Sequence, residues 1–258
     1  MRIVSLILTA LLLQVAHILA AQEVLRPVTS SYTLEGGSAH LHDTYLSPIG
    51  YDGMTYAFTY RRAQAMKFNP EQWVMQLNMS VGVDYTENPA RNATMWGTGI
   101  KAQWNMVHRW KLPHNITVAA GPGTGVNLGV LYLNRNQNNP ASAKASWSID
   151  ATGYVSWNTR LFNIPVTLRY QPVLPLTGVF FSPQYDELYY EIYLGNHKGL
   201  AHFGWWGNRP QVRSRLRADW QLGRYALTLG FDYRFQGLEC NGITTRMAQC
   251  SGVVGIAF

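Results

Sequence analysis

Hydrophobic and polar residues alternate with a period of two along much of the chain. In residues 72–85, QWVMQLNMSVGVDY, apolar side chains take the odd positions, and polar side chains or glycine take most of the even ones. Residues 225–235 repeat the pattern, and weaker versions occur at 96–110, 147–160 and 164–174. Alternate residues of a strand point to opposite faces, so each segment predicts a β-strand with one apolar and one polar face.

Three features favour an outer-membrane barrel over a soluble β-sandwich or barrel. Trp and Tyr lie near the strand ends on the apolar face, as they do at a membrane interface. The last strand ends on Phe258, with Val254 and Ile256 on the same face, which resembles the signal that such barrels present to their assembly machinery. Short connections, such as 162–163 and 223–224, alternate with long ones around 87–94, 134–146 and 176–187. The side chains expected to face lipid include Trp73, Trp104, Trp157, Trp220 and Phe231.

The predicted fold class is all-β, a closed antiparallel transmembrane β-barrel. We expect about 12 strands, with 10 or 14 as the alternatives, because each crossing needs about 9–11 residues and the number is even. The least certain strands are the first, near residues 32–41, and a pair within 188–206. Residues 22–51 are expected to supply the first strand and to include an N-terminal segment or plug.

The amino-terminal end has the layout of a secretory signal peptide. One basic residue precedes an apolar run from Ile3 to Leu13, and the small residues Ala20 and Ala21 follow. We predict cleavage after Ala21, which leaves residues 22–258 as one exported barrel domain in the cell outer membrane. The expected partners are outer-membrane lipid, lipopolysaccharide and the barrel-assembly machinery. We expect a monomer without a nucleic-acid partner.

The segment QVRSRLRADWQLGRYALTLGFDYRF, residues 211–235, places three arginines on one face of a strand. Glycine at the first position of Gly223–Arg224 suits a two-residue type II′ turn, and this turn fixes the register of the hairpin. It pairs Asp219 with Thr228 and Arg217 with Gly230. It also pairs Arg215 with Asp232, and Arg213 with Arg234. Because the apolar face meets lipid, the arginines must point into the lumen.

The candidate site is therefore a lumen with surplus positive charge. The residues assigned to it are Arg160, Arg169, Arg213, Arg215, Arg217 and Arg234. Asp84, Asp150 and Glu191 are the inward acids expected to offset these arginines, and Asp232 is expected to neutralise Arg215 alone. A surplus of positive charge would attract a small anionic solute and repel cations. A solvated ion-pair network that only rigidifies a filled barrel explains the pattern equally well.

Other chemistry has weaker support in the sequence. His40, His42, Asp43 and Ser47 are the parts of an acyl-transfer site, but Ser47 precedes Pro48 in an expected loop. We predict no catalytic residue, no metal site and no cofactor. The two cysteines, Cys240 and Cys250, would form a disulfide only across a loop wider than an Asn241–Gly242 turn.

The chain resembles an uncharacterised family of outer-membrane barrels, a domain of unknown function common in Bacteroides-type bacteria. The resemblance rests on DTYLSPIGYDG at residues 43–53, YYEIYLGNHKG at 189–199 and CNGI at 240–243. It implies a barrel in the outer membrane and no assigned activity. Three functions stay open: a small anion-selective channel, a non-conducting structural or assembly barrel that partners another envelope protein, and a lipid-modifying hydrolase.

Overall fold

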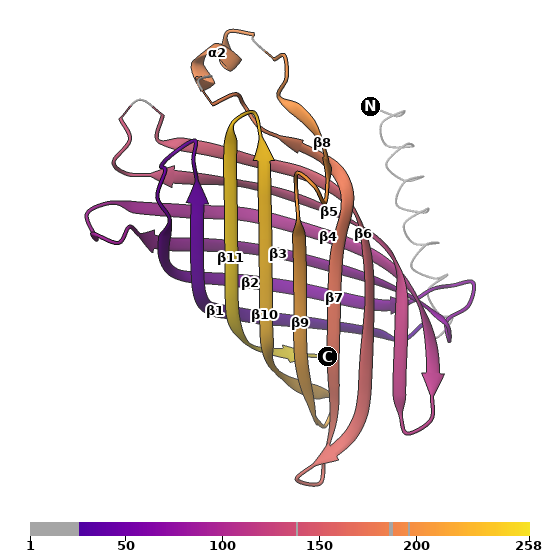
Figure 1. The fold of residues 1–258 in the computed structure, drawn as a ribbon. Coiled ribbons are helices and arrows are strands. Elements are labelled where there is room, and N and C mark those ends of the chain that lie inside the picture. The colour runs from indigo at the N-terminus through magenta and orange to yellow at the C-terminus, as the bar shows by residue number, and fades with distance from the viewer. Residues whose placement is uncertain (1–25, 138, 186–187, 196) are drawn as a thin grey trace, which may run out of the picture.

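The computed structural model describes residues 26–137, 139–185, 188–195 and 197–258. The predicted signal peptide, residues 1–21, lies outside the described residues. In the described part, ten antiparallel strands close into a barrel, with β1 hydrogen-bonded to β2 on one side and to β11 on the other (Figure 1). The ring strands are β1 (Val28–Asp43), β2 (Tyr51–Ala65), β3 (Trp73–Glu87), β4 (Thr94–Leu112), β5 (Ile116–Leu133), β6 (Ala141–Leu161), β7 (Ile164–Phe181), β9 (Gln211–Leu222), β10 (Tyr225–Cys240) and β11 (Ile243–Ala257).

The expected count of about 12 strands is wrong, and the alternative of ten is correct. The pair expected within 188–206 is instead a short helix, α2 (Tyr189–Tyr193), and one short strand, β8 (Ala201–Trp205). Among the described residues, β8 pairs with the last residues of β7, whereas β9 pairs with an earlier part of the same edge of β7. β9 continues the ring, so β8 lies outside it. The ring strands are 12 to 21 residues long, which exceeds the roughly 9–11 residues of a minimal crossing. A chain of this length therefore forms fewer strands than the expected 12.

The alternation along each strand sorts the side chains into an apolar exterior and a polar interior. Trp104, Trp157 and Phe231 are exposed on the outer face, while Trp73 and Trp220 are half-buried on the same face. The buried polar residues, among them Gln76, Asn105 and Asp150, point inward from their strands. This inversion of a soluble protein's pattern is typical of a barrel surrounded by lipid. Among the described residues, no helix is long and apolar enough to cross a membrane.

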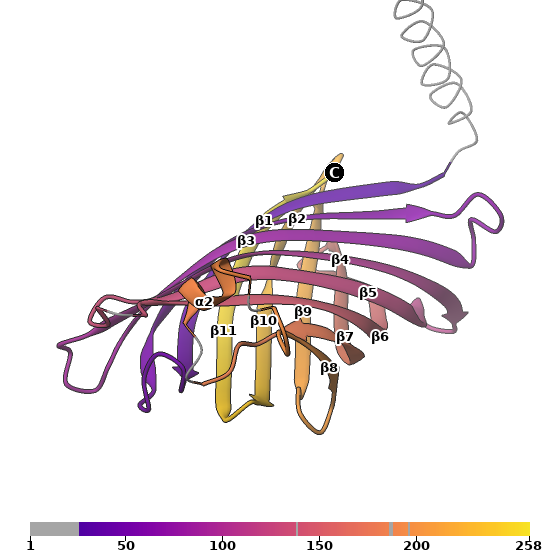
Figure 2. The ribbon, with the colours of Figure 1, turned by 90° about the horizontal axis from the view of Figure 1, so that it is seen from above.

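The two ends of the barrel differ. At the short-turn end, the connections are residues 66–72, 113–115, 162–163 and 223–224. The start of β1 and the carboxyl terminus lie at this end too (Figure 2). Ser30 N there donates to Phe258 O at 2.8 Å. Gly223 has φ of 67°, which a type II′ turn requires at its first position. The long-loop end carries the connections 44–50, 88–93, 134–140 and 182–210, besides the tight Asn241–Gly242 turn.

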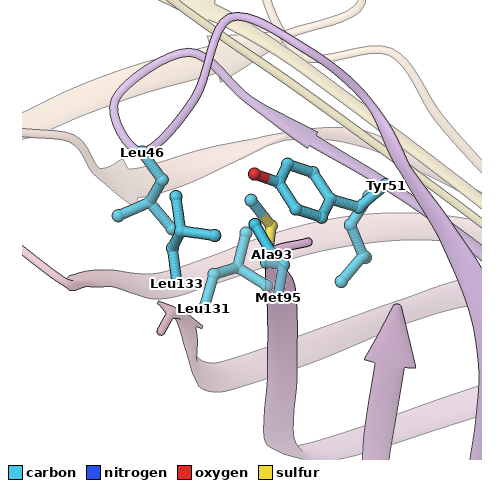
Figure 3. Packing of buried hydrophobic residues seen from close by; sticks show 7 residues of the cluster. Leu46, Tyr51, Ala93, Met95, Leu131 and Leu133 are labelled. Atoms are coloured by element: carbon cyan, nitrogen blue, oxygen red, sulfur yellow. The ribbon is translucent and has the colours of Figure 1, made fainter. Parts of the chain in front are cut away.

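An apolar cluster lies inside the barrel at the long-loop end, on the side of β1, β2, β4 and β5 (Figure 3). Its buried members are Leu41, Leu46, Tyr51, Ala93, Met95, Leu131 and Leu133. Leu46 reaches the cluster from the connection 44–50, and Asn136 Nδ2 donates to the Leu46 carbonyl at 2.8 Å. Residues 28–51 therefore form a wall strand and an inward-folded connection, and no plug runs along the lumen from them.

Candidate functional site in the barrel interior

The arginine hairpin has the register that the sequence predicts. Leu222 pairs with Tyr225, and the inward pairs are those expected, including Arg215 with Asp232 and Arg213 with Arg234. Arg213, Arg215 and Arg217 are all buried, at 9%, 7% and 4% exposure. β9 also pairs with β7, which places Arg169 directly opposite Arg217. Two pairs of like charges thus face each other across neighbouring strands, an arrangement that needs nearby anions.

The anions come from two buried carboxylates, Glu35 on β1 and Asp232 on β10. Asp232 forms ion pairs with Arg61 at 3.4 Å, Arg234 at 3.5 Å and Arg215 at 3.9 Å, and also with Arg217. Glu35 pairs with Arg234 at 2.5 Å and with Arg61 at 3.8 Å. We call these six residues (Glu35, Arg61, Arg215, Arg217, Asp232 and Arg234) the ion-pair layer.

The layer corrects the expected charge distribution. Asp232 is expected to neutralise Arg215 alone, but it also pairs with Arg61, Arg217 and Arg234. Four guanidinium groups nevertheless share two carboxylates, so the layer keeps a surplus of positive charge. In the described part of the chain, Arg213 has no ion pair, and its Nη2 donates to Asn127 Oδ1 at 3.0 Å.

Side chains from strands four steps apart around the ring meet across the interior of the barrel. Arg215 Nη2 donates to Gln103 Oε1 at 3.1 Å, from β9 to β4, and Gln103 Nε2 in turn donates to Asp150 Oδ2 at 3.1 Å. Gln171 Nε2 on β7 donates to Gln76 Oε1 on β3 at 2.8 Å. These direct contacts cross the lumen at this level. A narrow barrel is filled by side chains in this way.

Two cavities remain on either side of the filled centre. The one towards the long-loop end has a volume of about 80 Å³ and is lined by Lys101, Lys144 and Arg234 with the single buried carboxylate Asp84. The other, towards the short-turn end, has a volume of about 210 Å³. Its charged lining is mostly arginine: Arg61, Arg62, Arg109, Arg169, Arg215 and Arg217, with Asp219.

The structure brings together five of the six arginines assigned to the lumen. Arg160 does not join them, because it is exposed beside the 162–163 turn. Glu191 is not an inward acid either, because it lies on α2 outside the ring. Glu35 was missed, although it follows the alternation of β1, in which the buried residues Thr33, Ala39 and Leu41 share its face.

The parts of an acyl-transfer site do not form a nucleophile–base pair. His42 Nε2 lies 3.3 Å from the Pro48 carbonyl, and the Ser47 hydroxyl accepts from the Tyr51 hydroxyl at 3.4 Å. Asp43 is fully buried and pairs with Lys144 at 2.6 Å. A triad needs the histidine within hydrogen-bond reach of the serine, and these contacts point each group elsewhere.

The two cysteines are free. Cys240 pairs with Ile243 across the Asn241–Gly242 turn, while Cys250 lies opposite Tyr233 far along β11. This is the geometry expected for a tight turn, and it rules out a disulfide in this fold.

Fold and interior together define an outer-membrane type of β-barrel, with an apolar belt outside and ion-paired polar side chains inside. The chain belongs to the family described as "Protein of unknown function (DUF3316)", whose model matches residues 3–257. This confirms the uncharacterised family expected from the sequence, but it does not test its occurrence in Bacteroides-type bacteria. No curated protein matches the chain.

Several solved barrels resemble the chain at low identity. The transport unit of the autotransporter AIDA-I from Escherichia coli is 11% identical, with 91% of each chain covered and a TM-score of 0.47. The translocator domain of the autotransporter NalP from Neisseria meningitidis is 7% identical, covering 95% of this chain and 93% of that one, with a TM-score of 0.38. Neisserial surface protein A is 9% identical, with 88% and 95% covered and a TM-score of 0.32. Similarity at this level carries no argument about function.

Proposed function

We propose that this protein is an outer-membrane barrel that is closed to free diffusion and has a structural role, partnering another envelope protein. The observation that carries the proposal is the set of hydrogen bonds across the lumen, above all that between Arg215 and Gln103. The apolar cluster supports it, because its buried side chains occupy part of the interior at the long-loop end. A barrel crossed by these contacts and narrowed by this cluster would offer solutes no open path.

The lipid-facing exterior supports an outer-membrane location, and the placement of the start of β1 and of the carboxyl terminus at the short-turn end supports insertion from the periplasm. On this proposal the short-turn end faces the periplasm. The long loops, α2 and β8 face the cell exterior, where exposed aromatic side chains such as Tyr193 and Phe203 are available to a partner.

Planar-bilayer recording tests the closed state. The wild-type barrel should show no steady single-channel current. Arg215→Ala/Gln103→Ala, which removes the contact across the lumen, should raise the frequency of current steps. Gln221→Ala/Arg224→Ala changes only exposed residues at the short-turn end and serves as the matched control. Steady open channels in the wild-type protein would refute the proposal, and copurification from native membranes would identify the partner.

A second candidate is a small anion-selective channel that opens when the ion-pair layer is displaced. It is favoured by the ratio of four guanidinium groups to two carboxylates in that layer. In this case, asymmetric salt should give an anion-selective reversal potential that weakens in Arg213→Ser/Arg234→Ser. Cation selectivity would exclude this candidate.

We propose no catalytic role for His42 and Ser47, given the contacts described above. Release of fatty acid from phospholipid by the purified barrel, with or without calcium, would contradict this.

A further inference from the structure

The cavity at the short-turn end is the most basic part of the interior. Its volume is about 210 Å³, and five inward arginines line it: Arg61, Arg109, Arg169, Arg215 and Arg217. We call it the arginine cavity. The neutral side chains of Gln76, Asn78 and Gln171 lie between these arginines. Such a lining offers many hydrogen-bond donors and strong positive potential in a small volume.

Arg61, Arg215 and Arg217 already share the carboxylates of the ion-pair layer, and little further negative charge is available to balance the arginines of this cavity. Asp219 is the one carboxylate in the lining among the described residues, and its Oδ1 already accepts from the Thr228 hydroxyl at 2.6 Å. Arg169 has no ion pair there, and its guanidinium stacks on the Tyr154 ring at 4.9 Å. Arg109 likewise has none, and its Nη2 donates only to the carbonyls of Pro70 and Glu71, both at 2.9 Å.

Several guanidinium donors in this cavity also lack a hydrogen-bond partner. They are Nε of Arg61, Arg109, Arg169 and Arg217, and Nη1 of Arg215. Arg215 and Arg217 are more than nine-tenths buried, and their ion pairs with Asp232 leave these nitrogens without a partner in the protein. Buried charged donors without a partner are costly, and an anion in the cavity would remove that cost.

We propose that the arginine cavity is a binding site for a phosphate group that enters from the short-turn end. Guanidinium forks match the oxygens of a phosphate in pairs, and charge-assisted hydrogen bonds are the strongest of their kind. The low-dielectric walls make each contact worth more than it is in water. A volume of this size accommodates free phosphate or the phosphate of a small phosphomonoester. This inference goes beyond the proposed function and holds whether or not the barrel conducts.

Calorimetry on the full chain, refolded in detergent at constant ionic strength, tests the site with inorganic phosphate and glucose 6-phosphate as probes. Saturable binding of either supports the proposal, and the comparison shows whether free phosphate is sufficient. Arg169→Gln should weaken binding by about tenfold or more, because it removes one charge-assisted donor without touching the ion-pair layer. The affinity of Arg169→Lys for phosphate should lie between those of the wild-type protein and Arg169→Gln, because lysine keeps the charge but lacks the guanidinium fork.

Arg224→Gln is the matched control. Arg224 also stacks on a tyrosine, Tyr225, at 5.0 Å, and lies at the same end of the barrel but outside the cavity. Its replacement should leave the affinity unchanged. Absence of saturable phosphate binding by a barrel with heat-modifiable migration would overturn the proposal. Binding that Arg169→Gln and Arg224→Gln weaken equally would overturn it too, because the site would then be a diffuse surface charge.

Discussion

At the scale of single residues, the interior depends on Asp232. This one buried carboxylate faces four guanidinium groups from three strands, and Glu35 is the only other acid in the ion-pair layer. Each charge in such a group has lost its water, so the attraction between them mainly offsets desolvation. The layer is therefore better explained as a set of mutually dependent charges than as a sum of separate ion pairs.

Asp232→Asn should destabilise the barrel by about 3–5 kcal/mol, because it leaves several buried arginines with only Glu35 to balance them. Urea unfolding of the refolded protein, followed by heat-modifiable migration, measures this. Glu239→Gln is the control. Glu239 pairs with Arg246 at 3.6 Å with both side chains exposed, so its loss should change the stability by about 0–1 kcal/mol. Equal losses of stability in the two variants would show that the ion-pair layer stabilises the barrel no more than an exposed ion pair does.

At the scale of elements, closure depends on the seam between β1 and β11. These strands come from opposite ends of the chain and pair from Ser31–Ala257 to Asp43–Thr245. Gly37 lies in the middle of the seam, where an added Cβ would overlap the carbonyl oxygen of Cys250. Glycine permits this close approach of the two backbones, as it does elsewhere in strands.

Gly37→Ala should lower the refolding yield and destabilise the closed barrel by about 1–3 kcal/mol, because β1 and β11 must move apart. Gly252→Ala is a control on the same seam, since its Cβ would meet nothing closer than the Gly36 carbonyl oxygen at 3.8 Å. The heat-modifiable fraction after refolding measures both. A Gly37→Ala barrel that closes as well as Gly252→Ala would show that the seam tolerates a methyl group.

At the scale of the whole molecule, the two ends have opposite characters. The long-loop end contains the apolar cluster, whereas the short-turn end contains the arginine cavity. On the proposal above, phosphate enters from the side of the membrane that the short-turn end faces. The side depends on the orientation in the membrane, which the proposed function assigns.

A membrane-impermeant maleimide tests that orientation on intact cells. In a Cys240→Ser/Cys250→Ser background, Arg135→Cys in the connection 134–140 should be labelled. Arg224→Cys in the two-residue turn should react only after the outer membrane is permeabilised. Both native arginines are exposed, so accessibility to the reagent depends on the side of the membrane. The reverse labelling would place the short turns outside the cell.

Much of the fold follows from the sequence alone. Alternation with a period of two is a local property, since it depends only on which face of a strand each side chain takes. Arg213, Arg215 and Arg217 could therefore be placed inside, and the Gly223–Arg224 turn fixed their partners on β10 because a two-residue turn leaves no freedom of register. The strand number was missed because alternation shows where a strand is, but not how far it extends.

The site itself was decided by the tertiary structure. Glu35 meets Arg234 because closure of the ring brings β1 near β10, and no local pattern encodes a contact between residues 199 positions apart. The contact between Arg215 and Gln103 depends likewise on the narrowness of a ten-strand ring. The sequence by itself determined which side chains face the interior. Only the closed barrel decided which of them pair, which cross the lumen, and which arginines are left with unpaired donors, because these depend on distances across the ring and not along a strand.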